Sequence, residues 1–378
     1  MPVEGADGGF APSVRQVPDT QAKFGTRHVP TGAGTPGAGH DKGRNGTPCD
    51  NSCVGTVEDV RIAKRTGFCY GVREAIDKAK EASAAGKATH TLGQVVHNEG
   101  VVRDLQEMGI QTVETLDDVD HGAAVVIRAH GVRPDVMERA EARGLEVIDG
   151  TCTWVIQEQK ELARLVEEGY TIVVLGTPKH PEVVGLLGFA PDAIVVDEEE
   201  EWDAAIPRKK RMALLSQSTQ PPWKFEKLAA LMVSRAHELK IVNTVCPVTI
   251  RRQQDTMETA AEVDMMVVVG GRSSANTKEL TRLCEIGGTH AIQIENVRDL
   301  TDAAPFEGAK IVGVTGGTST PIEDLRDVTR RILELAGTPA AAAKADDLAE
   351  AALDRAATPA GRTTSLPHIT STPASGAA

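Results

Sequence analysis

Hydrophobic residues follow two patterns in turn between about residue 57 and residue 336. Short runs rich in valine, isoleucine and alanine, such as AAVVIRAHG, YTIVVLG, VDMMVVVGG and AKIVGVTGG, are continuous. Runs of this kind are typical of strands that are buried on both faces of a parallel sheet. Between them, segments such as TWVIQEQKELARLVEEG and TIRRQQDTMETAAEV have helical spacing. The alternation predicts an α/β fold with mostly parallel sheets.

The two ends of the chain show neither pattern. Residues 1–56 are rich in glycine, proline and threonine, and from residue 337 the chain becomes rich in alanine, threonine, proline and serine. Such segments bury too little apolar surface to offset the entropy lost on ordering. We therefore expect disordered tails at 1–56 and 337–378, with AAAAKADDLAEAALDRAA as an isolated helix in the second.

Three segments of the folded region share one plan: a strand, a polar or glycine break, a cysteine and then a helix. They are RTGFCYGVREAIDKAKEA, VIDGTCTWVIQEQKELA and IVNTVCPVTIRRQQDTM. The recurrence predicts three similar α/β modules at about 57–151, 152–243 and 244–336. Each module presents one cysteine at the carboxyl end of a strand, which is the sheet edge where ligands bind in open parallel sheets.

The three cysteines, Cys69, Cys152 and Cys246, are candidate metal ligands. A helix N-terminus favours the thiolate form. Zinc with three cysteines and a water is possible, but structural zinc sites usually use close CxxC pairs, which are absent here. A 4Fe-4S cluster fits widely separated cysteines better, and three thiolates leave one iron free to bind a substrate oxygen. The alternative is that these are ordinary small core residues.

The remaining cysteines have weaker contexts. Cys284 lies in the helical KELTRLCEIGG and is predicted to be a core residue, and Cys49 and Cys53 lie in the N-terminal tail with no expected role.

Charge and hydropathy narrow the function classes. A net charge of −13 argues against a general nucleic-acid binder. The chain has no run of about 18 apolar residues and no secretory signal pattern, so we expect no membrane span and a cytoplasmic location in which thiols stay reduced. An anionic small substrate remains compatible, because backbone N–H groups and a few side chains can hold phosphate locally.

Three histidines and one acid follow predicted strands. His97 lies in GQVVHNEGVV, His130 in IRAHGV and His180 in TPKHPEVVG. Imidazoles at strand ends can donate hydrogen bonds to phosphate oxygens, although each one alone is equally well explained as a turn residue. Glu182 can carry protons if burial raises its pKa; taken alone, it is better explained as a solvated carboxylate.

Three hydroxyl-rich loops also follow strands and precede helices: SQST at 216–219, GGRSSANT at 270–277 and TGGTSTP at 315–321. Their free N–H groups can bind an anion, although helix capping alone explains each loop singly. None of the three matches a Walker A or GxGxxG pattern, so neither a P-loop nor a Rossmann dinucleotide site is indicated.

Together these segments resemble the 4-hydroxy-3-methylbut-2-enyl diphosphate reductase (LytB) family, which catalyses the last step of the methylerythritol phosphate route to isoprenoids. The resemblance rests on GFCYGV, VVHN, RAHGV, DGTC, HPEVVG, SQST, NTVC with RRQ, GGRSSANT and GVTGGTSTP, in family order, over about residues 60–336.

The resemblance implies a trefoil of three modules around one 4Fe-4S cluster per chain, bound by Cys69, Cys152 and Cys246. It implies that Glu182 feeds protons to the leaving hydroxyl, and that a ferredoxin or flavodoxin supplies electrons. The products would be isopentenyl and dimethylallyl diphosphate. The residues implied to bind the substrate are His97, His130, His180, Ser218, Ser274, Ala275, Asn276 and Ser319.

Three positions depart from the family pattern. Ala275 replaces a common serine, and the lost hydrogen bond costs about 0.5–1.5 kcal/mol. Ser218 replaces a threonine and keeps the hydroxyl. GTCTWV replaces Ala-Thr-Cys-Pro and puts Trp154 near the cluster edge. Alternatives to the reductase are a paralogue with a shifted substrate, a non-redox iron–sulfur hydro-lyase, and an iron–sulfur ligand sensor.

Overall fold

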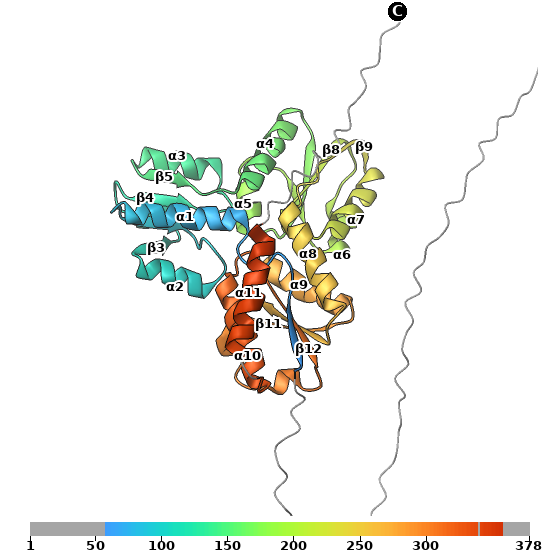
Figure 1. Cartoon of the computed structure of the whole chain (residues 1–378). Coiled ribbons are helices and arrows are strands. Elements are labelled where there is room, and N and C mark those ends of the chain that lie inside the picture. The colour runs from blue at the N-terminus through green and yellow to red at the C-terminus, as the bar shows by residue number, and fades with distance from the viewer. Residues whose placement is uncertain (1–56, 339–340, 358–378) are drawn as a thin grey trace, which may run out of the picture. The chain divides into compact units, whose positions relative to one another are not determined.

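The computed structural model describes residues 57–338 and 341–357, which contain three four-stranded sheets (Figure 1). Every pair of neighbouring strands is parallel. The predicted α/β class with mostly parallel sheets is therefore confirmed. The predictions for residues 1–56 and 358–378, including those for Cys49 and Cys53, lie outside the described residues.

The first sheet has the strand order β3-β2-β4-β5. Helices α1 and α2 pack on one face, and α3 packs on the other. The elements of this module are α1 (Tyr70–Ala84), β2 (Thr89–Leu92), α2 (Glu99–Glu107), β3 (Ile110–Val113), η1 (Leu116–Asp118), β4 (Ala124–Ile127), α3 (Pro134–Ala142) and β5 (Glu146–Asp149).

The second sheet has the order β7-β6-β8-β9. Helices α4 and α5 cover one face, and α6 and α7 cover the other. The elements of this module are α4 (Thr153–Glu167), β6 (Thr171–Leu175), α5 (Pro181–Leu187), β7 (Ile194–Val196), α6 (Glu199–Ala205), β8 (Lys209–Ser216), α7 (Pro222–Val233) and β9 (Ala236–Ile241).

The third sheet has the order β1-β12-β10-β11. Helices α8 and α9 pack on one face, and α10 and α11 pack on the other. Its elements are β1 (Asp59–Ile62), α8 (Pro247–Ala260), β10 (Met265–Val269), α9 (Ala275–Ile286), β11 (His290–Ile294), η2 (Val297–Asp299), η3 (Ala304–Phe306), β12 (Ile311–Gly316), α10 (Ile322–Leu335) and α11 (Ala341–Ala357).

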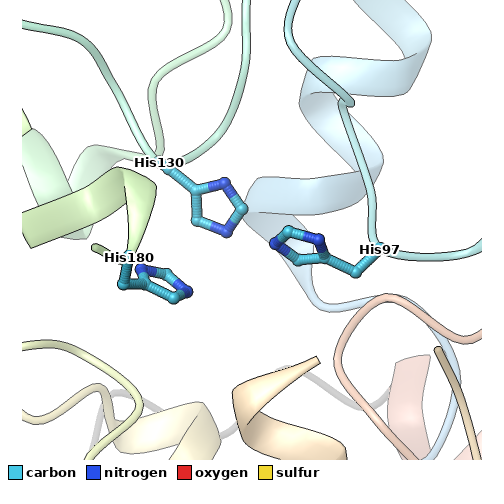
Figure 2. Close-up of side chains that lie close together, drawn as sticks. All are labelled: His97, His130 and His180. Atoms are coloured by element: carbon cyan, nitrogen blue, oxygen red, sulfur yellow. The ribbon is translucent and has the colours of Figure 1, made fainter. Parts of the chain in front are cut away.

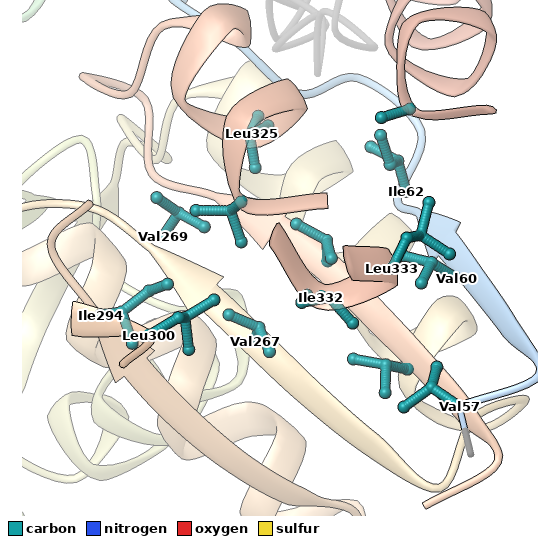
Figure 3. Packing of buried hydrophobic residues seen from close by; sticks show 14 of the residues in the cluster. Val57, Val60, Ile62, Val267, Val269, Ile294, Leu300, Leu325, Ile332 and Leu333 are labelled. Atoms are coloured by element: carbon teal, nitrogen blue, oxygen red, sulfur yellow. The ribbon is translucent and has the colours of Figure 1, made fainter. Parts of the chain in front are cut away.

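The N-terminal strand corrects one predicted boundary. Residues from 57 onward were expected in the first module, but β1 pairs with β12 and so belongs to the third sheet. Val57, Val60 and Ile62 are buried in the same core cluster as Leu333 of α10 (Figure 3). The four-residue strand DVRI is too short for its pattern to specify which sheet it joins, which is why the sequence analysis misplaced it.

The C-terminal prediction also needs correction. Helix α11 is not isolated, because Ala345, Ala349 and Ala352 are buried in the core of the third module. The ammonium group of Lys344 lies 3.2 Å from a carboxylate oxygen of Asp59 in β1. The folded region therefore extends to residue 357. Packing of these alanines against the core stabilises α11. The alanine-rich composition of the segment does not show that such a contact exists.

The predicted recurrence of strand, cysteine and helix is present, and it links neighbouring modules. Strand β5 ends the first sheet and precedes Cys152, and α4 then begins the second module; β9, Cys246 and α8 repeat this step. In the third sheet β1 takes the position that β5 and β9 hold in theirs, and it precedes Cys69 and α1. Each cysteine is therefore the N-cap residue at a junction between two modules.

Candidate active site

The three cysteines occupy equivalent places. Each donates its backbone N–H to a carbonyl oxygen in the loop after a central strand. That central strand pairs with the edge strand that precedes the cysteine. These bonds run from Cys69 to Thr318 (3.1 Å), from Cys152 to Ala129 (3.0 Å) and from Cys246 to Ser218 (2.9 Å). Equivalent backbone hydrogen bonds therefore fix the N-termini of α1, α4 and α8 around one centre.

Cys69, Cys152 and Cys246 line a single cavity. Gly71, in the first turn of α1, permits this close approach. A Cβ atom at that position would lie 2.6 Å from the Sγ of Cys152, which is closer than real Cβ contacts allow. Any larger residue at position 71 would displace one thiol from the cavity.

The three cysteines are partly buried, and no disulfide joins them to one another or to another described residue. Burial raises the pKa of Cys69, and it raises the pKa of Cys246 to about 11, although backbone N–H groups of the first helical turns partly oppose both shifts. An added positive charge, such as a metal centre, reverses this preference for the neutral thiol.

The spacing of the thiols indicates what they can hold. The cysteines come from three separate strand–helix junctions. They lack the close CxxC pairs that structural zinc sites usually use. Ligands so far apart in the sequence suit a centre that the whole fold encloses.

Three histidines form a second cluster (Figure 2). The ring centroid of His130 lies 5.4 Å from that of His97 and 5.2 Å from that of His180. They come from the loops after β2, β4 and β6, and His130 also lines the cysteine cavity. The Nδ1 atom of His180 accepts a hydrogen bond from the backbone N–H of Glu182 (3.2 Å), so its neutral ring carries the proton on Nε2.

The electrostatics of this cluster favour an anion. Burial lowers the pKa of His97, brings the pKa of His180 to about 4 and lowers the pKa of His130 well below its usual range. The positive charge of Arg128 contributes to all three shifts. The Nδ1 of His130 and the Nε of Arg128 are buried without a hydrogen-bond partner. Unsatisfied donors beside a fixed positive charge suit phosphate oxygens better than a cation.

The loop before α9 extends this anion site. The loop passes so close to His97 that a Cβ at Gly271 would lie 2.1 Å from the His97 carbonyl oxygen. Ser274 caps α9 by accepting from the Thr277 N–H at 3.3 Å. Asn276 is only 3% exposed, yet neither polar atom of its side chain has a partner. A buried amide without a partner is costly unless a ligand satisfies it.

Glu182 lies in the first turn of α5 and is 1% exposed, so it is not a solvated loop carboxylate. Its Oε1 accepts from the Ser218 N–H (2.6 Å) and its Oε2 accepts from the Ser218 hydroxyl (2.9 Å). Burial raises the pKa of Glu182, and the two bonds from Ser218 oppose the rise. The carboxyl group lines the cysteine cavity and suits proton transfer there.

The remaining candidates divide into two groups. Ser218 and Ser319 line the cysteine cavity, and so does Trp154, whose Nε1 donates to the Thr244 carbonyl at 2.7 Å. Ala275 lies instead along a neighbouring cavity beside Trp223. Cys284 is fully buried in the third module, as predicted for a core residue.

Three charged residues that the sequence reasoning did not select belong to this region. Arg128 precedes His130 by two residues and was visible in IRAHGV. Glu158, 1% exposed on α4, interacts electrostatically with Glu182. Neither of its oxygens has a partner with hydrogen-bond geometry among the described residues, although Thr244 lies close enough to favour the ionised form. Arg252, on α8, faces the cysteine loops. A charged residue within a helical pattern is normally interpreted as solvent-exposed. The sequence therefore held no signal for Glu158, whereas Arg252 stands in the RRQ motif quoted for the family resemblance.

This fold and site define an α/β enzyme whose repeated strand-end loops bring thiols, imidazoles and a buried acid to one place. Comparison with known proteins shows which family the chain belongs to. The sequence profile described as LytB protein matches residues 60–333.

Curated relatives agree along almost their whole length. The 4-hydroxy-3-methylbut-2-enyl diphosphate reductase of Geobacter metallireducens is 37% identical over 277 residues, which is 73% of this chain and 98% of the relative. The protein of the same name from an Anaeromyxobacter species is 40% identical over 264 residues, 70% of this chain and 94% of the relative.

Solved structures give the same result. One described as (E)-4-hydroxy-3-methyl-but-2-enyl diphosphate reductase, the terminal enzyme of the non-mevalonate pathway, aligns with a TM-score of 0.56 and 33% identity, covering 73% of this chain and 99% of that one. The E-1-hydroxy-2-methyl-but-2-enyl-4-diphosphate reductase of Plasmodium falciparum aligns with a TM-score of 0.68 and 26% identity, covering 75% and 90%. The chain belongs to the LytB family.

No helix within the described ranges has both the length and the apolar character needed to cross a membrane.

Proposed function

We propose that this chain catalyses the reductive dehydroxylation of (E)-4-hydroxy-3-methylbut-2-enyl diphosphate to isopentenyl and dimethylallyl diphosphate. The observation that carries the proposal is the convergence of three thiols, the Glu182–Ser218 pair and His130 on one cavity. The reaction breaks the allylic C–O bond, consumes two electrons and two protons, and releases water. Relatives with this named activity support the assignment.

Cys69, Cys152 and Cys246 would hold one 4Fe-4S cluster through their thiolates. Their common cavity and the backbone N–H groups around Cys69 and Cys246 suit such a centre. When bound with three protein ligands, the cluster supplies one-electron transfer and an iron corner that acts as a Lewis acid for the hydroxyl oxygen. Glycine at position 71 leaves the space that the thiol set needs.

The diphosphate would bind to the histidine cluster and the loop before α9. His97, His130 and His180 offer imidazole donors next to Arg128, and Asn276 offers a buried amide with no protein partner. Ser274 and Ser319 add hydroxyls from the third module. Ala275 would contribute through its backbone at the start of α9, since its side chain has no donor.

Glu182 would give its proton to the departing hydroxyl, because water is a better leaving group than hydroxide. Burial keeps the carboxyl group protonated at higher pH than in water, and Ser218 orients it. The second proton goes to the allylic carbon, where either of two positions yields one of the two products.

The electrons would come from an external donor of the ferredoxin or flavodoxin type. None of the three strand-end loops at 216–219, 270–277 and 315–321 matches a P-loop or GxGxxG pattern, which agrees with an external source of reducing power. Thiolate ligands that must remain reduced suit the cytoplasm.

Anaerobic assay of the full-length protein tests the proposal. The loaded protein should be brown, and with dithionite and a viologen dye it should consume the hydroxylated diphosphate and form both products. A colourless protein that holds stoichiometric zinc would reject the cluster, and substrate that stays intact with every donor would reject the activity.

Glu182→Gln tests the proton step. The variant should keep the cluster and the substrate affinity but lose most of its turnover. The control is Glu226→Gln, because Glu226 is exposed on α7 and should not affect turnover. Full turnover in Glu182→Gln would remove Glu182 from the mechanism.

The same assay separates the alternatives. A non-redox hydro-lyase would convert substrate without any donor, and a ligand sensor would bind diphosphates without turnover. A paralogue with a shifted substrate would turn over another allylic diphosphate faster. The buried acid beside the thiols favours the reductase over the sensor, since a sensor needs no proton donor.

A further inference from the structure

Arg252 is a buried cation beside the cysteine loops. It lies on α8 and is 3% exposed. Its guanidinium donates hydrogen bonds to three backbone carbonyl oxygens, those of Gly67, Gly316 and Gly317, each at 2.8 Å. Gly67 precedes Cys69 by two residues, and Gly317 precedes Thr318, the acceptor of the Cys69 N–H. The side chain therefore links both backbone segments that place the Cys69 thiol.

Arg252 has no anionic protein partner of its own. It takes part in none of the ion pairs found between described residues. Asp255, one turn further along α8, attracts it, but both oxygens of that carboxylate accept hydrogen bonds from Arg65 at 2.8 Å. The carbonyl oxygens accept from both terminal nitrogens of Arg252 but carry no net charge to balance it, and among the described residues its Nε is buried without a hydrogen-bond partner.

A buried guanidinium without a counter-ion is costly, because burial removes the solvation of its charge. The groups whose negative charge attracts Arg252 most include the thiolates of Cys69 and Cys246. These charges are present when the cysteines ligate a metal centre. The fold therefore leaves one positive charge unpaired at the place where a thiolate-bound centre brings negative charge.

We propose that Arg252 is the fixed counter-charge of the cysteine-bound centre and sets its reduction potential. The proposal rests on the iron–sulfur centre inferred above. Reduction adds negative charge to the centre, and a nearby cation in a low-dielectric interior stabilises the reduced form more than the oxidised form. Arg252 thus raises the potential and makes the centre easier to reduce. It acts on the electron step as a positioning residue that does not contact substrate.

The test is the midpoint potential of the anaerobically loaded full chain, measured by dye-mediated titration. Arg252→Gln removes the charge and should lower the potential, shifting the equilibrium with a one-electron mediator at least tenfold, which corresponds to 59 mV. Arg252→Lys keeps the charge and should shift the potential much less. The control is Arg235→Gln. Arg235 is partly buried and donates to the Ile206 carbonyl, but it pairs with Asp203 and lies beside the start of β8, at the amino ends of the strands of the second sheet.

Each outcome bears on the proposal. A loaded Arg252→Gln protein with an unchanged potential overturns it. If Arg252→Gln does not fold or load, then loading and a near-native potential in Arg252→Lys support the charge role. If Arg252→Lys also does not fold or load, Arg252 only stabilises the loops structurally, and the proposal is overturned. Absence of a cluster in the unaltered protein would instead reject the proposed function itself.

Discussion

Ser218 donates two hydrogen bonds to Glu182, one from its backbone N–H to Oε1 at 2.6 Å and one from its hydroxyl to Oε2 at 2.9 Å. The carbonyl of the same residue accepts the N–H of Cys246 at 2.9 Å. One serine therefore orients the candidate acid and positions one candidate metal ligand. This connection couples the proton source to the thiol set, because a shift of the loop after β8 would move both.

Loss of the Ser218 hydroxyl should change the pH dependence of turnover. The hydroxyl stabilises the ionised form of Glu182, so Ser218→Ala should raise the pKa of that carboxyl group further. An acid catalyst is active below its pKa, so the decline of kcat with rising pH should move to higher pH. Looser orientation of the carboxyl should also lower the maximal kcat, by roughly tenfold for a hydrogen bond of about 1.4 kcal/mol.

The matched variant is Ser218→Thr, which keeps the hydroxyl and adds a methyl group. It should retain the pH profile of the unaltered protein. A Ser218→Ala profile that superimposes on that of Ser218→Thr would show that the hydroxyl does not act on Glu182.

The histidine cluster should take up protons when it binds an anion. Burial lowers the pKa of His130 well below its usual value, and a bound diphosphate raises it again by favouring the charged ring. Inorganic pyrophosphate should therefore bind with a stronger preference for low pH in the unaltered protein than in His130→Asn. At pH 6 the variant should bind about tenfold more weakly, as expected for one lost charge-assisted hydrogen bond.

Calorimetry of both proteins between pH 6 and 8 checks this prediction, since the protonation of pyrophosphate itself is common to both and cancels in the comparison. Equal pH dependence in the two proteins would remove His130 from the anion site.

Glu158 should make the folded state less stable as the pH rises. Burial, with a smaller contribution from Glu182, raises its pKa well above the ordinary 4.5. Between 4.5 and the raised value the folded state binds the proton more tightly than the unfolded state, so the free energy of unfolding falls as pH rises. Above the raised pKa of Glu158 the free energy of unfolding no longer falls with pH on account of this group.

Glu158→Gln does not titrate and should escape this loss. The two proteins should have similar stability near pH 4, whereas at neutral pH the variant should be more stable by about 1–3 kcal/mol, the usual cost of an unsatisfied buried group. Urea unfolding at several pH values measures the difference, with Glu226→Gln as the exposed control. A constant difference across the range would contradict the burial argument.

Gly71→Ala should prevent assembly of the thiol set. The added Cβ would lie 2.6 Å from the Sγ of Cys152, and neither α1 nor the Cys152 backbone can shift without losing its hydrogen bonds. Iron content after anaerobic reconstitution should fall by at least tenfold. Gly185→Ala is the control, because a Cβ at Gly185 in α5 meets its neighbours only at 3.7 Å and should leave the iron content unchanged.

Much of this arrangement was predictable, because it depends on local pattern. Continuous apolar runs gave the parallel strands, and the repeated cysteine plan gave three modules with one thiol each. Glu182 and His130 were proposed as candidates because they follow predicted strands and because of the family resemblance, and the structure places both along the cysteine cavity. Arg252 and Glu158 were missed because a charge within a helix is usually exposed, and only packing shows that these two are buried.

The sequence by itself determined the alternation of strands and helices and the recurrence of one cysteine before each of three helices, because both depend on residue spacing along the chain. Tertiary structure decided that β1 completes the third sheet, that α11 packs against the same module, and that two charged helix residues are buried near the site. The physical reason is that pairing and burial depend on contacts between segments far apart in the chain, for which local periodicity carries no information.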